Sequence, residues 1–168
     1  YDNQLFYSLS NSDIVSQNLE TEWDIAFECS NYGSHIILNS STSGSVSKTN
    51  VFDFESINSL NGNENWKYDA PNGNLDSTAF GDYSNGHICI LNRGISVSNG
   101  GNNLGYKKII IKTISSSQYE IRCADLNGDN DTTLIINKDT NFNFLAFSFT
   151  KHSTVDIFPP KQNWDIYF

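Results

Sequence analysis

The fold class is decided by the stretch Thr21-Glu22-Trp23-Asp24-Ile25-Ala26-Phe27. Its large apolar side chains, Trp23, Ile25 and Phe27, recur at every second position. That alternation is typical of a β-strand with one buried face, because successive side chains on a strand point to opposite sides of the sheet. We therefore expect a strand here, with these three side chains facing the core together.

Short apolar or alternating runs on either side predict further strands, separated by turns rich in Asn, Ser, Gly and Asp. The predicted strands cover residues 5–9, 14–16, 35–38, 87–94, 106–114, 118–124, 134–136, 143–149, 155–158 and 164–168. The tight turn Ser115-Ser116-Ser117 joins two of them as a hairpin. The region around 50–85 has no clear period and is predicted to be a long irregular loop. With 168 residues, the chain fits a single all-β domain built from antiparallel hairpins.

The charge balance excludes one class of partner. The chain carries 19 acidic and 10 basic residues, a formal charge of −9, whereas nucleic-acid binding needs clustered Lys and Arg. The one basic cluster, Lys107, Lys108 and Lys112, is interpreted as a solvated strand face. The negative charge also repels anionic membrane surfaces.

Motifs of catalysis and metal binding are missing from the sequence. It has no nucleophile elbow, no paired zinc-ligand helix motif and no phosphate-binding loop, and no CxxC pair accompanies its three cysteines. The run from Asp125 to Asp131 echoes a calcium loop, but it has Asn130 where that loop needs Gly and no Glu at the twelfth position. It is interpreted as an ordinary hairpin loop. The sequence therefore predicts a binding protein with no catalytic residues and no metal site.

The opening motif has an echo at the other end of the chain. Residues 163–168, Asn-Trp-Asp-Ile-Tyr-Phe, repeat the pattern of residues 22–27. The sequence is accordingly divided into a β domain of residues 1–162 and a terminal strand of residues 163–168. This strand is interpreted as the start of a second unit, and we expect the natural polypeptide to continue past Phe168.

Two motifs together resemble the HmuY-like family of Bacteroidota. One is Trp23-Asp24-Ile25-Ala26-Phe27 followed by Ile37-Leu38-Asn39 and a Ser/Gly loop to Ser45; the other is the late hairpin of residues 107–112 and 119–122. The resemblance implies a non-enzymatic, all-β protein on the extracellular face of the outer membrane, either secreted or held as a lipoprotein. Membrane contact is then expected only through a lipid anchor upstream. It also implies haem capture and delivery to a TonB-dependent transporter.

The haem ligands that this resemblance implies are harder to place. Methionine is absent, which excludes thioether ligation, and the histidines are His35, His87 and His152. Axial ligation needs a neutral imidazole beside an apolar cleft. His87, with Tyr83 nearby, and His152 are therefore the candidate haem-binding residues, whereas His35 is expected in a buried strand.

Two other functions stay open. One is an accessory subunit of an outer-membrane transport or secretion complex that has no small-molecule ligand. The other is a carbohydrate-binding module, for which the loop offers Trp66, Tyr68, Phe80 and Tyr83 as stacking platforms.

Overall fold

The computed structural model describes residues 2–168 and confirms an all-β protein, with no α-helix in that range. The strands are β1 (Asn3–Ser8), β2 (Asp13–Leu19), β3 (Ile25–Glu28), β4 (Ile36–Leu38), β5 (Ser45–Lys48), β6 (Cys89–Asn92), β7 (Ile95–Ser96), β8 (Asn102–Asn103), β9 (Tyr106–Ser115), β10 (Gln118–Asp125), β11 (Thr132–Asn137), β12 (Phe144–Ser148), β13 (Ser153–Val155) and β14 (Ile166–Tyr167). Three 3-10 turns, η1 (Ser40–Thr42), η2 (Phe54–Ser56) and η3 (Leu75–Ser77), lie in the connections. Within the described chain, no helical segment is long and apolar enough to cross a membrane.

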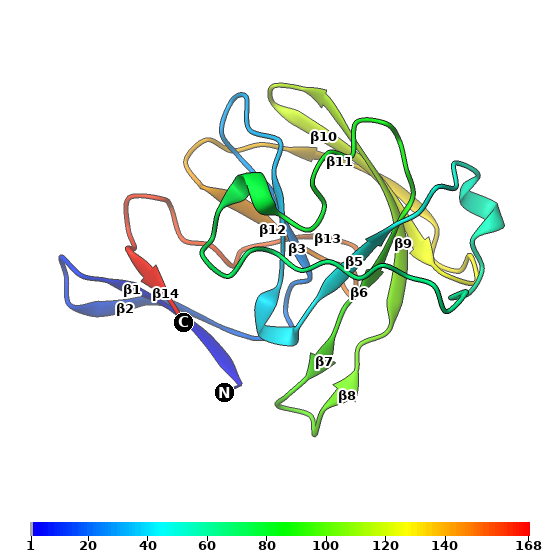
Figure 1. The fold of residues 1–168 in the computed structure, drawn as a ribbon. Coiled ribbons are helices and arrows are strands. Elements are labelled where there is room, and N and C mark those ends of the chain that lie inside the picture. Colours follow the sequence, from blue (N-terminus) through cyan, green and yellow to red (C-terminus); the bar gives the residue numbers. More distant parts are fainter. Residues whose placement is uncertain (1) are drawn as a thin grey trace.

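Three antiparallel sheets pack against one another as layers (Figure 1). The five-stranded sheet has the order β11-β10-β9-β6-β5, the four-stranded sheet β13-β12-β3-β4, and the three-stranded sheet β14-β1-β2. A small two-stranded hairpin, β7-β8, projects from the base of the five-stranded sheet. The hairpin predicted around residues 115–117 is confirmed as β9-β10, in which Ile121 pairs with Ile111.

The main core fills the space between the five-stranded and four-stranded sheets. Its members are large apolar side chains from the facing strands, including Ile25, Phe27, Ile36, Leu91, Ile109, Ile111, Tyr119, Ile121 and Phe147. A second core lies on the other face of the four-stranded sheet, against β1 and the segment after β13. A third joins the outer face of the five-stranded sheet to the loop that contains η2. The four-stranded and five-stranded sheets are covered on both faces. Their strands are therefore continuous apolar runs and do not alternate strictly between apolar and polar residues.

The strand that decides the fold is buried on both sides. Trp23, Ile25 and Phe27 are 2%, 0% and 1% exposed, so their predicted burial is confirmed. The expectation that they share one face is wrong. Ile25 and Phe27 pack in the main core, whereas Trp23 precedes β3 and packs with Ala26 in the second core. The chain turns before β3 begins, so the period-2 rule does not reach back to Trp23.

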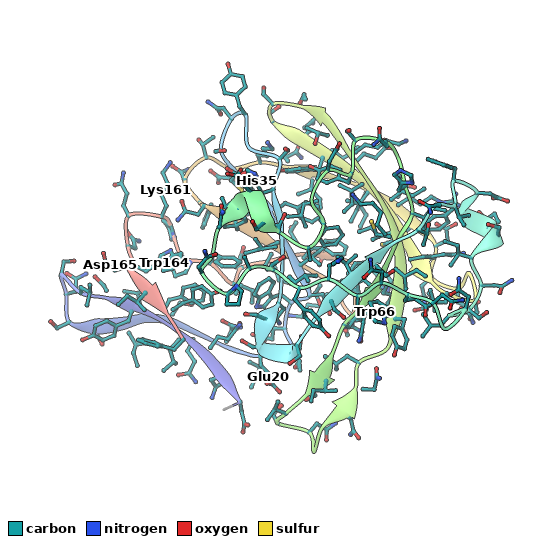
Figure 2. The ribbon with its side chains drawn as sticks, in the orientation of Figure 1. Glu20, His35, Trp66, Lys161, Trp164 and Asp165 are labelled. Carbon is teal, nitrogen blue, oxygen red and sulfur yellow. The ribbon has the colours of Figure 1, made fainter. Side chains whose placement is uncertain are left out.

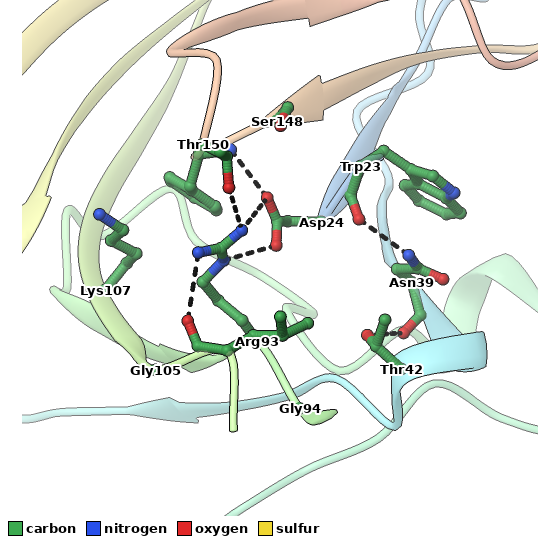
Figure 3. A network of polar contacts seen from close by, with 12 residues as sticks. Trp23, Asp24, Asn39, Thr42, Arg93, Gly94, Gly105, Lys107, Ser148 and Thr150 are labelled. Carbon is green, nitrogen blue, oxygen red and sulfur yellow. Dashed lines mark hydrogen bonds and ion pairs between the residues drawn. The ribbon is translucent and has the colours of Figure 1, made fainter. Parts of the chain in front are cut away.

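The charged residue of this motif, Asp24, forms a buried ion pair (Figure 3). Arg93 donates from Nε to Oδ1 of Asp24 at 2.7 Å, and the backbone N–H of Phe149 donates to Oδ2 at 2.7 Å. Arg93 also donates to Thr150 Oγ1 and to the carbonyl of Leu104. The pair therefore joins β3, the end of β12 and the base of the β7-β8 hairpin.

The long loop between β5 and β6 is irregular as predicted, and buried polar contacts hold it in place. Lys108 is 1% exposed, and its Nζ donates to the carbonyls of Phe54 and Ile57 at 2.9 and 2.8 Å. The interpretation of the lysine cluster as a solvated strand face is thus wrong for Lys108, which this loop covers, and for Lys107, which is 8% exposed and pairs with Asp125. Farther along, the carboxylate of Asp69 accepts the backbone N–H groups of Leu38 and Ala79, each at 2.7 Å.

Candidate functional site

The predicted haem-binding residues do not converge on one site. His87 lies two residues before β6, and its ring is 4.7 Å from that of Phe52, centroid to centroid. His152 lies in the turn between β12 and β13, in a left-handed conformation with φ 50°. Burial raises the pKa of nearby Asp125, but hydrogen bonds from Lys107 and Asn130, with smaller contributions from the charges of Lys107 and His152, outweigh it, so this pKa is lowered overall. His87 precedes the start of β6, whereas Arg93, just past the end of β6, donates to Thr150, two residues before His152. The two histidines therefore lie toward opposite ends of β6.

The side chain of Tyr83 packs in the main core. It is 7% exposed, and its hydroxyl donates to the carbonyl of Ser34 at 2.6 Å and lies 2.9 Å from Thr113 Oγ1. Burial raises the pKa of Tyr83, which disfavours the phenolate that would bind iron. Phe80 is buried in the same core, so these two members of the proposed carbohydrate platform are unavailable to a sugar. Tyr68, at 62% exposed, remains accessible.

His35 precedes β4 instead of lying inside a buried strand. Its Nδ1 is 2.5 Å from Oε2 of Glu28, and its side chain is 34% exposed. Burial raises the pKa of Glu28, but hydrogen bonds from Ser30 and His35 outweigh it, so the pKa is lowered overall. A cavity of about 460 Å³ beside this pair is lined by charged and polar residues, among them Asp76, Asp82 and Lys112.

A second cavity, of about 530 Å³, has a different lining. It is bounded by five aromatic residues, with Ile37 and Leu75 completing the apolar wall and Glu28 and Lys161 as its charged residues. The aromatic residues are Phe142, Phe144, Phe158, Trp164 and Tyr167. A smaller cavity of about 280 Å³ lies beside it and shares Ile37, Leu75, Phe144 and Tyr167 with it. We call the larger of these two cavities the aromatic groove.

The walls of the aromatic groove come from distant parts of the chain. Phe144 stands on β12, beside Glu28 of β3. Trp164 packs edge-on against Phe6, with 5.0 Å between ring centroids, and its Nε1 donates to the carbonyl of Pro159 at 3.1 Å. Tyr167 of β14 stacks on Phe6 at 5.6 Å. Figure 2 shows Trp164 and Lys161 on the side of the molecule away from Trp66. Sequence reasoning missed this site, although its signal was the aromatic density of residues 142–167.

Comparison with known proteins identifies the family. A family model described as HmuY protein matches residues 1–164. The chain belongs to the HmuY family. No curated protein and no solved structure matches it. The HmuY family is a family of non-enzymatic haem-binding surface lipoproteins, so the interpretation of this chain as a protein without catalytic activity is confirmed.

The aromatic groove of this HmuY-family chain has the apolar, aromatic lining that a porphyrin ring needs, but it lacks the side chains that usually bind haem iron. Ligand pockets are concave, mainly apolar and about 300–1,000 Å³ in volume. Phe142, Phe144, Trp164 and Tyr167 are at least partly exposed and can contact a porphyrin, whereas Phe158 is buried behind them. The lining contains no His, Met or Cys. The three cysteines are buried elsewhere, and burial raises the pKa of Cys89 and Cys123 to about 11. The residues present therefore fit the porphyrin ring but provide no pair of axial histidines.

In the described part of the chain, no group of three or more His, Cys, Asp or Glu side chains could hold a metal ion. In the loop that resembles a calcium site, the carboxylate oxygens are already bonded to neighbouring side chains. Asp125 pairs with Lys107 and accepts from Asn130, while Asp131 pairs with Arg122.

Proposed function

We propose that this chain is a cell-surface protein that captures a planar tetrapyrrole of the haem class in the aromatic groove. The observation that carries the proposal is the groove itself, with its five aromatic side chains and a volume of about 530 Å³. Membership of a haem-binding family supports the ligand class. The ring is held by stacking and apolar contact, since the lining has no histidine or methionine to bind the iron.

The proposed cellular location of the protein is the one typical of the HmuY family. We place the protein on the extracellular face of the outer membrane, attached through an upstream lipid anchor. Its ligand would pass to a TonB-dependent transporter of the same membrane. The formal charge of −9 supports attachment by an anchor rather than by the protein surface, because an acidic surface is repelled by anionic headgroups.

Titration with two porphyrins tests the proposal. Hemin and metal-free protoporphyrin IX are each added to the purified protein, and both the porphyrin absorption band and tryptophan fluorescence are followed. Because the groove offers the iron no histidine, methionine or cysteine, the two porphyrins should bind with dissociation constants within about tenfold of each other. Phe144→Ala should weaken both at least about fivefold, since truncating an aromatic contact in a pocket costs roughly 1–3 kcal/mol.

A substitution at a tryptophan outside the groove controls for effects on porphyrin binding that do not come from groove contacts. Trp66 is a half-buried tryptophan outside the groove, 6.0 Å from the ring of Tyr106. Trp66→Phe should leave porphyrin binding unchanged, whereas Trp164→Phe should remove most of the ligand-dependent quenching. A sharp low-spin hemin spectrum that His87→Ala or His152→Ala abolishes would show that the site lies at the histidines, and the groove proposal would fail.

A second function, that of an interaction subunit in an outer-membrane complex, is favoured by a separate observation. Ile14 and Leu19 on β2 are each 48% exposed, and exposed apolar patches on a monomer mark interaction surfaces. This role is compatible with ligand capture. It becomes the main function if neither porphyrin binds.

A further inference from the structure

The three-stranded sheet β14-β1-β2 has two chemically different faces. On β1, Gln4, Phe6 and Ser8 are buried, while the alternate residues are more exposed. The register extends this alternation to the neighbouring strands, because Phe6 pairs with Tyr167 and Tyr7 pairs with Ile14 and Ile166. Tyr167 therefore lies on the inner face, where it lines the aromatic groove. Ile14 and Ile166 lie on the outer face.

The outer face is apolar and uncovered by any described residue. Of the fourteen large apolar side chains exposed in the described chain, seven come from this sheet and its first turn. They are Leu9, Ile14, Val15, Leu19, Ile166 and Phe168, together with Tyr167 of the inner face. Of these, Ile14, Ile166 and Phe168 stand beside Leu5 and Tyr7 by register and by hydrogen bonding. Figure 1 shows the sheet at one side of the molecule, with only one of its faces toward the other sheets.

The charged side chains of this sheet and its turns are all acidic, and the nearest basic residue in the sequence, Lys161, lines the aromatic groove on the inner side. Residues 2–47 and 162–168, which include the whole sheet, contain no Lys or Arg. Asp13 and Asp165 lie at one end of the strands, where Asp165 accepts the backbone N–H of Leu9 (Figure 2). Asp2 and Glu22 lie at the other end, where Glu22 accepts the N–H of Leu19. An apolar centre is thus bordered by carboxylates.

The apolar centre and the acidic border together indicate which kind of partner can bind this face. A second copy docking through the same face would bring acidic borders against each other, which costs free energy. An anionic bilayer surface would be repelled for the same reason. A protein surface with an apolar centre and basic borders would satisfy both features. We propose that the outer face of the β14-β1-β2 sheet is a docking surface for a partner protein whose contact patch is apolar and bordered by Lys or Arg side chains.

The proposal is tested by site-specific photo-cross-linking in the cells that produce the protein. A benzophenone amino acid is placed at Ile14, and at Ile135 of β11 as the matched control, since both side chains are 48% exposed. Position 14 should give one discrete protein adduct that position 135 does not give. Mass spectrometry should map the adduct to an apolar segment of the partner with Lys or Arg beside it.

Two further measurements with the purified partner complete the test. Asp2→Lys with Asp13→Lys should weaken binding about threefold to tenfold and reduce its dependence on salt. Asp76→Lys, at a side chain of η3 that is 89% exposed and outside the three-stranded sheet, should leave binding unchanged. Urea midpoints of all variants are compared so that loss of binding is not mistaken for loss of folding.

Several results would overturn the proposal: no discrete adduct, the same adduct from positions 14 and 135, adducts with lipid, or adducts with a second copy of the chain. Equal binding by the charge-reversed and native proteins would do the same. Because no porphyrin is needed in any of these assays, failure here is distinguishable from failure of the groove.

Discussion

The buried ion pair between Asp24 and Arg93 supports a quantitative prediction. The side chains are 2% and 10% exposed, so Asp24→Ala leaves the guanidinium of Arg93 buried without its carboxylate. It also leaves the N–H of Phe149 without its acceptor. Removing one partner of a buried pair costs about 3–5 kcal/mol. With a urea dependence of about 2 kcal/mol per molar for a domain of this size, the unfolding midpoint should fall by about 2 M.

The assay is urea unfolding followed by tryptophan fluorescence. The matched control is the pair between Lys112 and Glu120, whose side chains are 63% and 32% exposed. Glu120→Ala should cost under about 1 kcal/mol, because exposed pairs contribute little. In a double-mutant cycle, Asp24→Ala and Arg93→Ala together should cost clearly less than the sum of the two single changes. A midpoint shift below about 0.5 M for Asp24→Ala, or simple additivity, would refute the reasoning.

Three other changes have definite expected outcomes. Trp23→Ala should lower the free energy of unfolding by about 3–5 kcal/mol, the range for truncating a buried aromatic, as measured by urea unfolding; a loss under about 1 kcal/mol would contradict the packing. Lys108→Met should release the loop around Phe54 and speed limited proteolysis there, with sites in β9 unaffected; an unchanged cleavage pattern would show that the two carbonyl contacts do not hold the loop. The lowered pKa of Glu28 contributes stability above its unfolded value of 4.5, and this is lost as the pH falls through the folded pKa. Glu28→Gln should therefore lose less stability than native protein on acidification below about pH 4.5, and identical acid profiles would contradict this.

The fold was predictable because its signals lie within short segments. The hairpin of β9 and β10 follows from two apolar runs and one serine turn, and the structure confirms it. What local periodicity could not show is which side of each strand would be covered by another layer. Trp23 and Ala26 lie in the second core only because β1 and the segment after β13 pack there. Lys108 is buried only because a loop some fifty residues earlier in the chain crosses it.

The motif that carried the family resemblance has a structural role. Asp24 binds Arg93, and Asn39 donates to the carbonyls of Glu20 and Trp23 at 2.6 and 2.8 Å while its backbone carbonyl accepts from Thr42. These contacts fix the scaffold, so the motif identifies the fold but gives no information about the ligand. The aromatic groove depends on residues as far apart as Ile37 and Tyr167, and only the folded chain brings them together.

The pairing of β1 with β14 also sets the order of events in folding. Phe6 contacts Tyr167 across almost the whole length of the sequence, and contacts of such separation form late because closing a long loop is entropically costly. One wall of the groove is therefore absent until the last strand has docked. A chain in which β14 has not yet paired with β1 therefore has no completed pocket in which to enclose a ligand.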